Sequence, residues 1–327
     1  MTAVARHLAM MITAVITVCV SGPVSADEYP SRPVTVIVPY APGGATDILG
    51  RFVAQKLSER LGVRFVVENR AGAGTLIGAS ATARSAPDGY TLLLATSTTL
   101  SINQRIYKKL PYDAAKDFIP VALVASVPFA LLVNPSLPAN TTGELVALAK
   151  SKPGQLSFGH AGVGSPPHLF AELFKSMSGT DIEGAAYKGE GPALVDLVAG
   201  HIPISFATIS ASLSLITSGK VRALGISSAN RAAAAPQIAP LGDAVPGYDA
   251  SAWQMLVAPA GTPRAIIAKL NSEVNAMIKV SENTEYLGKI GLIPLGEGSS
   301  EQLTQFVSAE TLRWAKIVDQ AGVAGTQ

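Results

Sequence analysis

Residues 34–47 read Val-Thr-Val-Ile-Val-Pro-Tyr-Ala-Pro-Gly-Gly-Ala-Thr-Asp. The valine-rich run over 34–38 predicts a buried strand, and apolar residues at helical spacing from Ile48 onward predict a helix. The Gly-Gly turn therefore opens directly into a helix, whose first turn exposes unpaired N–H groups and a partial positive charge. Glycine also lets an anion approach the backbone closely. This loop indicates a site for a carboxylate, sulfate or phosphate; the alternative is a tight turn that binds nothing.

Strand and helix patterns alternate along most of the remaining chain. Beyond the first strand, we expect strands over residues 64–68, 90–95, 156–159, 183–187, 203–207 and 221–226. Helical patterns separate them, and such alternation predicts an α/β fold with mainly parallel sheets covered by helices. The C-terminal region is mostly helical, and Ser299 with Gln302 forms the capping-box pattern that starts a helix.

Two groups of these strand–helix units predict two lobes. Lobe 1 is expected to contain residues 27–125 and 252–327, and lobe 2 residues 126–251. Extended runs near 121–133 and 252–258 are the candidates for crossings between the lobes. Such an arrangement creates a cleft where ligands prefer to bind, and the carboxyl ends of the strands are expected to face it.

The N-terminus has the pattern of a signal peptide. Arg6 precedes an apolar stretch over 8–20, and small residues lead to Ala26, after which we expect cleavage. The apolar stretch is too short for a retained membrane anchor. Cys19 leaves with residues 1–26, so the mature chain is expected to contain no cysteine and no disulfide. We expect secretion to a bacterial periplasm.

Charge and motif spacing argue against several classes of function. The net charge of +2 and the lack of a basic run argue against a nucleic-acid partner. The glycine motifs depart from the dinucleotide-binding fingerprint, and no phosphate-binding Gly-Lys-Ser/Thr sequence occurs. We therefore expect no cofactor. We also expect no metal, because no metal-ligand spacing relates the histidines His7, His160, His168 and His201.

A second strand-to-helix loop, residues 162–168, reads Gly-Val-Gly-Ser-Pro-Pro-His. The backbone N–H groups of Gly164 and Ser165 and the Ser165 hydroxyl could hold an anion, with His168 in the first helical turn. An N-cap serine beside an incidental surface histidine is the alternative. Two such loops in one chain favour a binding function more than either does alone.

Polar residues also follow other expected strands. Ser97 and Thr98 come after the strand over 90–95 and either supply hydroxyl groups to the cleft or form an ordinary polar loop. Residues 187–192 form a third strand-to-helix loop, and Thr208 lies in a fourth.

Motifs of enzymes are mostly missing. No Gly-x-Ser-x-Gly turn surrounds Ser165, although Ser165 and His168 could approach each other across one helical turn. A serine hydrolase also needs an acidic group that orients the histidine and an oxyanion hole, which the sequence does not place. We expect no catalytic residues, and a secreted hydrolase that uses this pair is the less favoured alternative.

Seven short motifs occur in order along the chain. They include Tyr-Pro-x-Arg-Pro, Pro-Tyr-x-Pro-Gly-Gly-x-x-Asp and Pro-Asp-Gly-Tyr-Thr-Leu, and they lie at residues 29–33, 39–47, 67–74, 87–92, 110–113, 162–168 and 187–192. Together these motifs resemble the substrate-binding receptors of tripartite tricarboxylate transporters, the Bug-type periplasmic proteins. The resemblance extends from Tyr29 to near the C-terminus.

The resemblance implies a two-lobed, Venus-flytrap solute-binding protein without catalysis. Such a receptor captures a small mono- or dicarboxylate, including amino or hydroxy acids, by lobe closure and delivers it to the membrane subunits of a tripartite transporter. We expect a monomer. An orphan receptor or sensor that acts through a protein partner is a further alternative.

The resemblance also implies which residues bind the ligand. Backbone N–H groups of the first loop hold a carboxylate beside an aromatic wall at position 40, and the second loop contributes from the other lobe. With the hydroxyl groups that follow the strand over 90–95, the expected ligand-binding residues are Tyr40, Gly43, Gly44, Ala45, Thr46, Asp47, Ser97, Thr98, Gly164, Ser165, His168 and Thr208.

Asp47 leaves two interpretations open. A carboxylate beside an anion site repels the anion unless it serves another partner. If Asp47 faces the cleft, the ligand is expected to carry an ammonium, amide or hydroxyl donor. If Asp47 caps the helix towards solvent, as aspartate commonly does at this position, no such inference follows.

Overall fold

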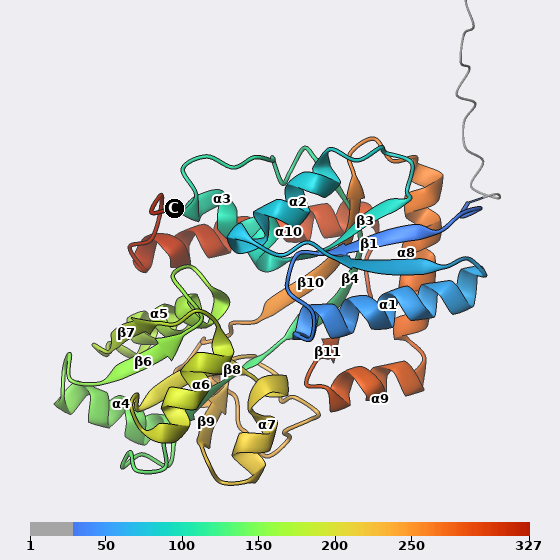
Figure 1. The fold of residues 1–327 in the computed structure, drawn as a ribbon. Coiled ribbons are helices and arrows are strands. Elements are labelled where there is room, and N and C mark those ends of the chain that lie inside the picture. The colour runs from blue at the N-terminus through green and yellow to red at the C-terminus, as the bar shows by residue number, and fades with distance from the viewer. Residues whose placement is uncertain (1–28) are drawn as a thin grey trace, which may run out of the picture.

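Two β-sheets covered by helices form the fold of residues 29–327, the part of the chain that the computed structural model describes (Figure 1). The predicted signal peptide, residues 1–26, lies outside the described residues, as does Cys19. We call the part built on the six-stranded sheet lobe 1 and the part built on the five-stranded sheet lobe 2. Within residues 29–327, no helix combines the length and the apolar character needed to cross a membrane.

Lobe 1 contains a six-stranded sheet in the order β11-β4-β10-β3-β1-β2. Its strands are β1 Val34–Val38, β2 Phe65–Asn69, β3 Thr91–Thr96, β4 Phe118–Val127, β10 Ala252–Pro259 and β11 Ile293–Pro294. Its helices are α1 Ala45–Leu61, α2 Leu76–Ala83, α3 Asn103–Ile106, α8 Arg264–Ile278, α9 Ser281–Lys289 and α10 Ser300–Gln320. The predicted capping box at the start of α10 is confirmed, because Ser299 and Gln302 each accept the other's backbone N–H through their side chains.

Lobe 2 contains a five-stranded sheet in the order β7-β6-β8-β5-β9. Its strands are β5 Phe129–Val133, β6 Ser157–His160, β7 Glu183–Ala186, β8 Ile204–Thr208 and β9 Arg222–Ile226. Its helices are α4 Thr142–Ser151, α5 Pro166–Ser178, α6 Glu190–Ala199 and α7 Ile209–Thr217.

The predicted α/β fold with a helical C-terminal region is confirmed, but the sheets are mixed rather than mainly parallel. Only β1, β2 and β3 in lobe 1 and β6, β7 and β8 in lobe 2 pair in parallel among the described strands. β10 runs antiparallel to β3 and β4, and β5 runs antiparallel to β8 and β9. Parallel neighbours are joined by crossover helices within one sheet, whereas β5 and β10 each enter their sheet from the other lobe.

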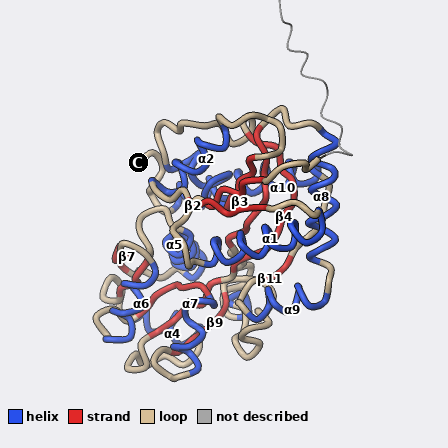
Figure 2. The backbone as a smooth tube through the Cα atoms, turned by 45° about the vertical axis from the view of Figure 1, so that its right-hand side comes forward, coloured by secondary structure: helices blue, strands red, loops and turns tan. Residues whose placement is uncertain are grey.

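Helices lie on both faces of the sheets (Figure 2). Successive side chains of the central strands pack against helices on opposite faces, as the alternation of a strand requires. In β1, Val36 belongs to the core formed with α1 and α8, whereas Ile37 packs with α2 and α10. In β5, Leu131 belongs with α4 and α5, whereas Leu132 packs with α6 and α7. Helices cover both faces of each sheet, so a cavity can form only at an end of the strands. It forms at the loops that follow the parallel strands.

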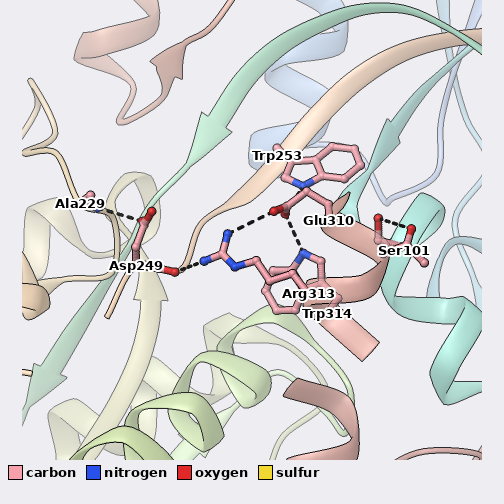
Figure 3. A network of polar contacts seen from close by, with 8 residues as sticks. Ser101, Ala229, Asp249, Trp253, Glu310, Arg313 and Trp314 are labelled. Atoms are coloured by element: carbon pink, nitrogen blue, oxygen red, sulfur yellow. Dashed lines mark hydrogen bonds and ion pairs between the residues drawn. The ribbon is translucent and has the colours of Figure 1, made fainter. Parts of the chain in front are cut away.

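A buried carboxylate fastens α10 to the strand that returns from lobe 2 (Figure 3). Glu310 Oε2 accepts hydrogen bonds from Trp253 Nε1 at 2.8 Å and from Trp314 Nε1 at 3.0 Å. Arg313 Nη1 lies 3.2 Å from Glu310 Oε1, and the other terminal nitrogen of Arg313 donates to the backbone carbonyl of Asp249. These contacts tie α10 to the segment that leads into β10.

The same helix also contacts lobe 2. The Trp314 ring stacks on Phe170 of α5 with centroids 5.7 Å apart. Within lobe 2, the Tyr248 hydroxyl holds Phe170 by donating to its carbonyl oxygen at 3.0 Å. The apolar core is therefore continuous from one lobe to the other beside the crossing strands.

Candidate functional site

A cavity of about 710 Å³ lies between the two lobes. The N-cap residues of α1, α5 and α6, which are Gly44, Ser165 and Gly189, all line it. No side chain caps any of these three helices. Because a helix N-terminus carries a partial positive charge and unpaired N–H groups, the cavity is suited to an anion.

The first of these helix ends follows β1, and we call residues 43–46 the first cradle. Gly44, Ala45 and Thr46 line the cavity. Gly43 lies just behind them and has a φ of +90°, a left-handed conformation that favours glycine. The Gly-Gly turn predicted from the sequence thus presents the start of α1 to the cavity.

Asp47 supports the first cradle from outside the cavity lining. Its carboxylate is buried and accepts hydrogen bonds from the N–H of Gly43 at 2.9 Å, from Asn69 Nδ2 at 2.8 Å and from Arg51 Nε at 3.0 Å. Burial raises the pKa of Asp47, but the bonds from Arg51, Gly43 and Asn69 outweigh it and hold the pKa below its usual value. Asp47 therefore acts on the loop backbone, in the manner of a cap, and not on the cavity.

The second helix end follows β6, and we call residues 162–165 the second cradle. Gly164 and Ser165 line the cavity, and the Ser165 hydroxyl donates to the Gly162 carbonyl oxygen at 2.6 Å. Gly164 has a φ of +75°, and a Cβ atom at this position would overlap the side chain of Ile106 in lobe 1. Glycine is therefore needed here both for the backbone conformation and for the close approach of the two lobes.

His168 lies behind the second cradle rather than in the cavity wall. Its Nδ1 accepts the N–H of Gly164 at 3.2 Å, and its ring lies 4.3 Å from the ring of His160. Burial, followed by the charges of His160 and Lys175, lowers the pKa of His168 to about 4. The ring is thus neutral at neutral pH and acts as an acceptor.

Ser165 and His168 do not form the pair that a serine hydrolase needs. The Ser165 hydroxyl donates to Gly162, and the His168 nitrogen nearest the loop is bonded to Gly164. A nucleophile must instead hydrogen-bond its base.

The side walls of the cavity carry polar groups. Within residues 29–327, the buried atoms Ser97 Oγ and Gln254 Oε1 have no hydrogen-bond partner. Gln254 donates through Nε2 to Thr46 Oγ1 at 3.2 Å, and the Tyr40 hydroxyl lies 3.5 Å from Thr96 Oγ1. Buried polar atoms are rarely left unpaired in a folded protein, so Ser97 Oγ and Gln254 Oε1 are candidates for hydrogen bonds with a ligand in the cavity.

Residues of α6 and β8 also line the cavity. Glu190, the first residue of α6, lines the cavity, and its carboxyl group accepts hydrogen bonds from the N–H and the hydroxyl group of Thr208. Burial raises the pKa of Glu190. Thr208 also caps α7 by accepting the N–H of Ala211.

The structure brings most of the predicted site residues to this one cavity. Those that line it are Tyr40, Gly44, Ala45, Thr46, Ser97, Thr98, Gly164, Ser165 and Thr208. Those that lie behind it as supports are Gly43, Asp47 and His168. Glu190 and Gln254 also line the cavity, and neither was expected from the sequence to bind the ligand. Glu190 could have been found as an acid that directly follows a glycine in a strand-to-helix loop, and Gln254 as a single polar residue inside an apolar run.

No lysine, arginine or histidine side chain lines the cavity within residues 29–327. An anion there would be held by neutral donors, which are backbone N–H groups, hydroxyl groups and side-chain amides. In the same part of the chain, no three histidine, cysteine, aspartate or glutamate residues form a group that could hold a metal ion.

Two lobes with crossing strands and a cavity between them define a binding protein of the periplasmic type. The solved periplasmic binding protein BugD has this fold, with a TM-score of 0.78 and 32% identity over 90% of this chain and 99% of that chain. The chain belongs to the tripartite tricarboxylate transporter receptor family, whose pattern it matches over residues 49–323.

Other relatives agree with this assignment. Protein BugT of Bordetella pertussis is 40% identical over 321 residues, which are 97% of this chain and 98% of BugT. A protein of R. palustris solved with adipate has a TM-score of 0.82 and 38% identity, covering 90% of this chain and 99% of that chain. MatC of Rhodopseudomonas palustris, solved with bound malate, has a TM-score of 0.76 and 33% identity over 89% of this chain and all 100% of that chain.

Proposed function

We propose that this protein is a periplasmic receptor that captures a small carboxylate between its lobes and delivers it to the membrane subunits of a tripartite transporter. The observation that carries the proposal is the pair of uncapped helix N-termini, those of α1 and α5, that open into one cavity from opposite lobes. A carboxylate bound between them satisfies donors of both lobes at once, which favours a closed arrangement of the lobes. Relatives with adipate and malate bound support a carboxylate as the ligand.

The two lobes then move as the units expected from the sequence, residues 27–125 with 252–327 against residues 126–251. The lobes are joined at Pro128, between β4 and β5, and by the segment before β10. The buried Ser97 hydroxyl, which has no partner in the described part of the chain, can donate to a ligand carboxylate. The unpartnered Gln254 Oε1 is an acceptor and would bind a donor group of the ligand.

The test is thermal unfolding of protein that has been refolded free of carried-over ligand, in the presence of mono-, di- and tricarboxylates. A ligand at a hundred times its Kd adds about 2.7 kcal/mol to the free energy of unfolding, which raises the midpoint of a chain of this size by about 5 °C. We expect such a rise for at least one carboxylate.

Ser165→Ala removes a hydroxyl group from the second cradle and is expected to reduce the midpoint shift of that carboxylate by half or more, as a loss of about tenfold in affinity would. Ser176→Ala is the matched control, because Ser176 is exposed on the same helix, α5. The proposal fails if no carboxylate stabilises the wild-type protein, or if both variants lose the shift equally.

A further inference from the structure

Glu190 places an acidic group in a cavity whose other features favour an anion. It lines the cavity beside Thr208, at the first position of α6. Within residues 29–327, it is the one charged side chain of the lining. A ligand that offers nothing but carboxylates would therefore meet a group of its own charge.

The carboxyl group of Glu190 is held in place but not saturated. Oε1 accepts the backbone N–H of Thr208, and Oε2 accepts the Thr208 hydroxyl at 3.2 Å. Each carboxylate oxygen can accept about two hydrogen bonds, so one acceptor position on each oxygen is left. The two bonds fix the orientation of the group at the cavity wall.

The cavity supplies no cation to balance this group. No lysine, arginine or histidine is among the residues of its lining in the described chain. Burial raises the pKa of Glu190, and the two hydrogen bonds from Thr208, which favour the ionised form, offset this only in part. A positively charged group on the ligand is the partner that would satisfy it.

We propose that the ligand carries an ammonium group as well as a carboxylate, and that Glu190 selects it by accepting a charge-assisted hydrogen bond. This inference rests on the proposed function, because it adds a second recognition point to the carboxylate site of the two cradles. The ligand class is then the amino acids and other ammonium-bearing carboxylates. Hydrogen bonds between an ammonium and a carboxylate are among the strong ones, and their loss leaves the carboxylate unpaired.

The experiment is isothermal titration of the ligand-free protein with pairs of compounds that differ only by an amine. Suitable pairs are succinate with L-aspartate, glutarate with L-glutamate, and butyrate with 4-aminobutyrate. For at least one pair, we expect the amine-bearing member to bind ten times or more tightly than its partner.

Glu190→Gln tests the residue itself. Glutamine has the same shape and can still accept the N–H of Thr208, so the fold is expected to persist, which the thermal midpoint without ligand checks. The variant is expected to lose the preference for the amine-bearing member. Asp196→Asn is the matched control, because it removes the same charge from the same helix at a residue outside the lining, and it is expected to keep the preference.

The outcomes separate this inference from the proposed function. Tighter binding of the amine-bearing member that disappears in Glu190→Gln supports the inference. Carboxylate binding with no preference for the amine, or equal weakening of both members by Glu190→Gln, overturns the inference and leaves the receptor in place. Tighter binding of the amine-free dicarboxylates overturns it as well and indicates a protonated Glu190 that donates to a second carboxylate. If no member of any pair binds, the proposed function fails together with the inference.

Discussion

The two cradles have the same geometry but opposite electrostatics. In each, a glycine with positive φ precedes the N-cap residue, and the third residue of the helix accepts the N–H of that glycine through its side chain. In α1 the acceptor is the ionised Asp47, with Arg51 one turn further on. In α5 it is the neutral His168, and Glu172 occupies the position one turn further on.

A carboxylate and an imidazole thus accept the same glycine N–H in the two cradles. The shared feature is this hydrogen bond, and not the charge of the acceptor. Asp47 is ionised and is paired with Arg51, whereas His168 is kept neutral because burial lowers its pKa. The two lobes should therefore respond differently to substitution and to pH.

The largest effect is expected for Asp47→Ala. This change leaves the N–H of Gly43 without its acceptor and removes the charged partner of Arg51. It also removes one of the two acceptors of Asn69 Nδ2, the other being the carbonyl oxygen of Tyr40. We expect the free energy of unfolding to fall by about 3–4 kcal/mol, as measured by urea denaturation. Glu59→Gln, an exposed site on the same helix, should change it by less than about 0.5 kcal/mol. A loss below about 1 kcal/mol for Asp47→Ala would show that the first cradle holds its shape without the carboxylate.

An intermediate effect is expected for alanine at the two cradle glycines. Gly43→Ala meets open space and carries only the cost of its positive φ, about 1 kcal/mol. Gly164→Ala carries that cost and also overlaps Ile106 of lobe 1, so we expect a loss of about 2–3 kcal/mol. Adding Ile106→Ala to Gly164→Ala removes the overlap and should make the second change less costly in the Gly164→Ala background than in the wild-type protein. Equal costs at the two glycines would contradict the close approach of the lobes at Gly164.

The smallest effect is expected for the pH dependence of stability. His168 has a pKa of about 4 in the folded protein against an ordinary value of 6.5, because it is buried near His160 and Lys175. The unfolded chain therefore takes up a proton that the folded chain does not, and stability falls as pH drops from about 6.5 towards 4. We expect this contribution to be below about 1 kcal/mol, since the ring keeps some contact with solvent.

The contribution of His168 must be separated from those of other groups that titrate nearby. Glu190 has a raised pKa and acts in the opposite direction, and His160, whose pKa burial lowers, acts in the same direction. Glu172 and Lys175 also face His168 from α5. Comparing the wild-type protein with His168→Gln isolates the effect, because glutamine keeps an acceptor for Gly164 without titrating. Parallel pH profiles for the two proteins would refute it.

The sequence predicted the strand-to-helix units because their pattern is local. Valine-rich runs, the Gly-Gly turn and the Ser299 capping box each lie within a few residues of the structure they form. The mixed pairing of the sheets could not be predicted in this way, since it depends on β5 and β10 entering from the other lobe. That arrangement is a property of the whole chain.

For the site, the sequence predicted which loops meet but not which side chains of those loops face the cavity. Tyr40 and Ser165 reach the lining, whereas the carboxylate of Asp47 turns back onto the loop, where one oxygen accepts the N–H of Gly43 and the other accepts Asn69 Nδ2. Glu190 was not selected, although its loop was, because an acid in an anion site contradicts the simplest expectation. The spacing shared by the two cradles, a glycine four residues before an acceptor, is a signal that the sequence does contain.

Both tryptophans of the chain donate to the same carboxylate, that of Glu310, where α10 meets the strand that joins the lobes. One of them, Trp253, lines the cavity, and the other, Trp314, stacks on Phe170 of lobe 2. The tryptophan fluorescence of this protein therefore originates where α10 meets the strand that joins the lobes. Because indole emission responds to nearby charge and water, it offers an optical test of the proposed lobe closure that needs no attached dye.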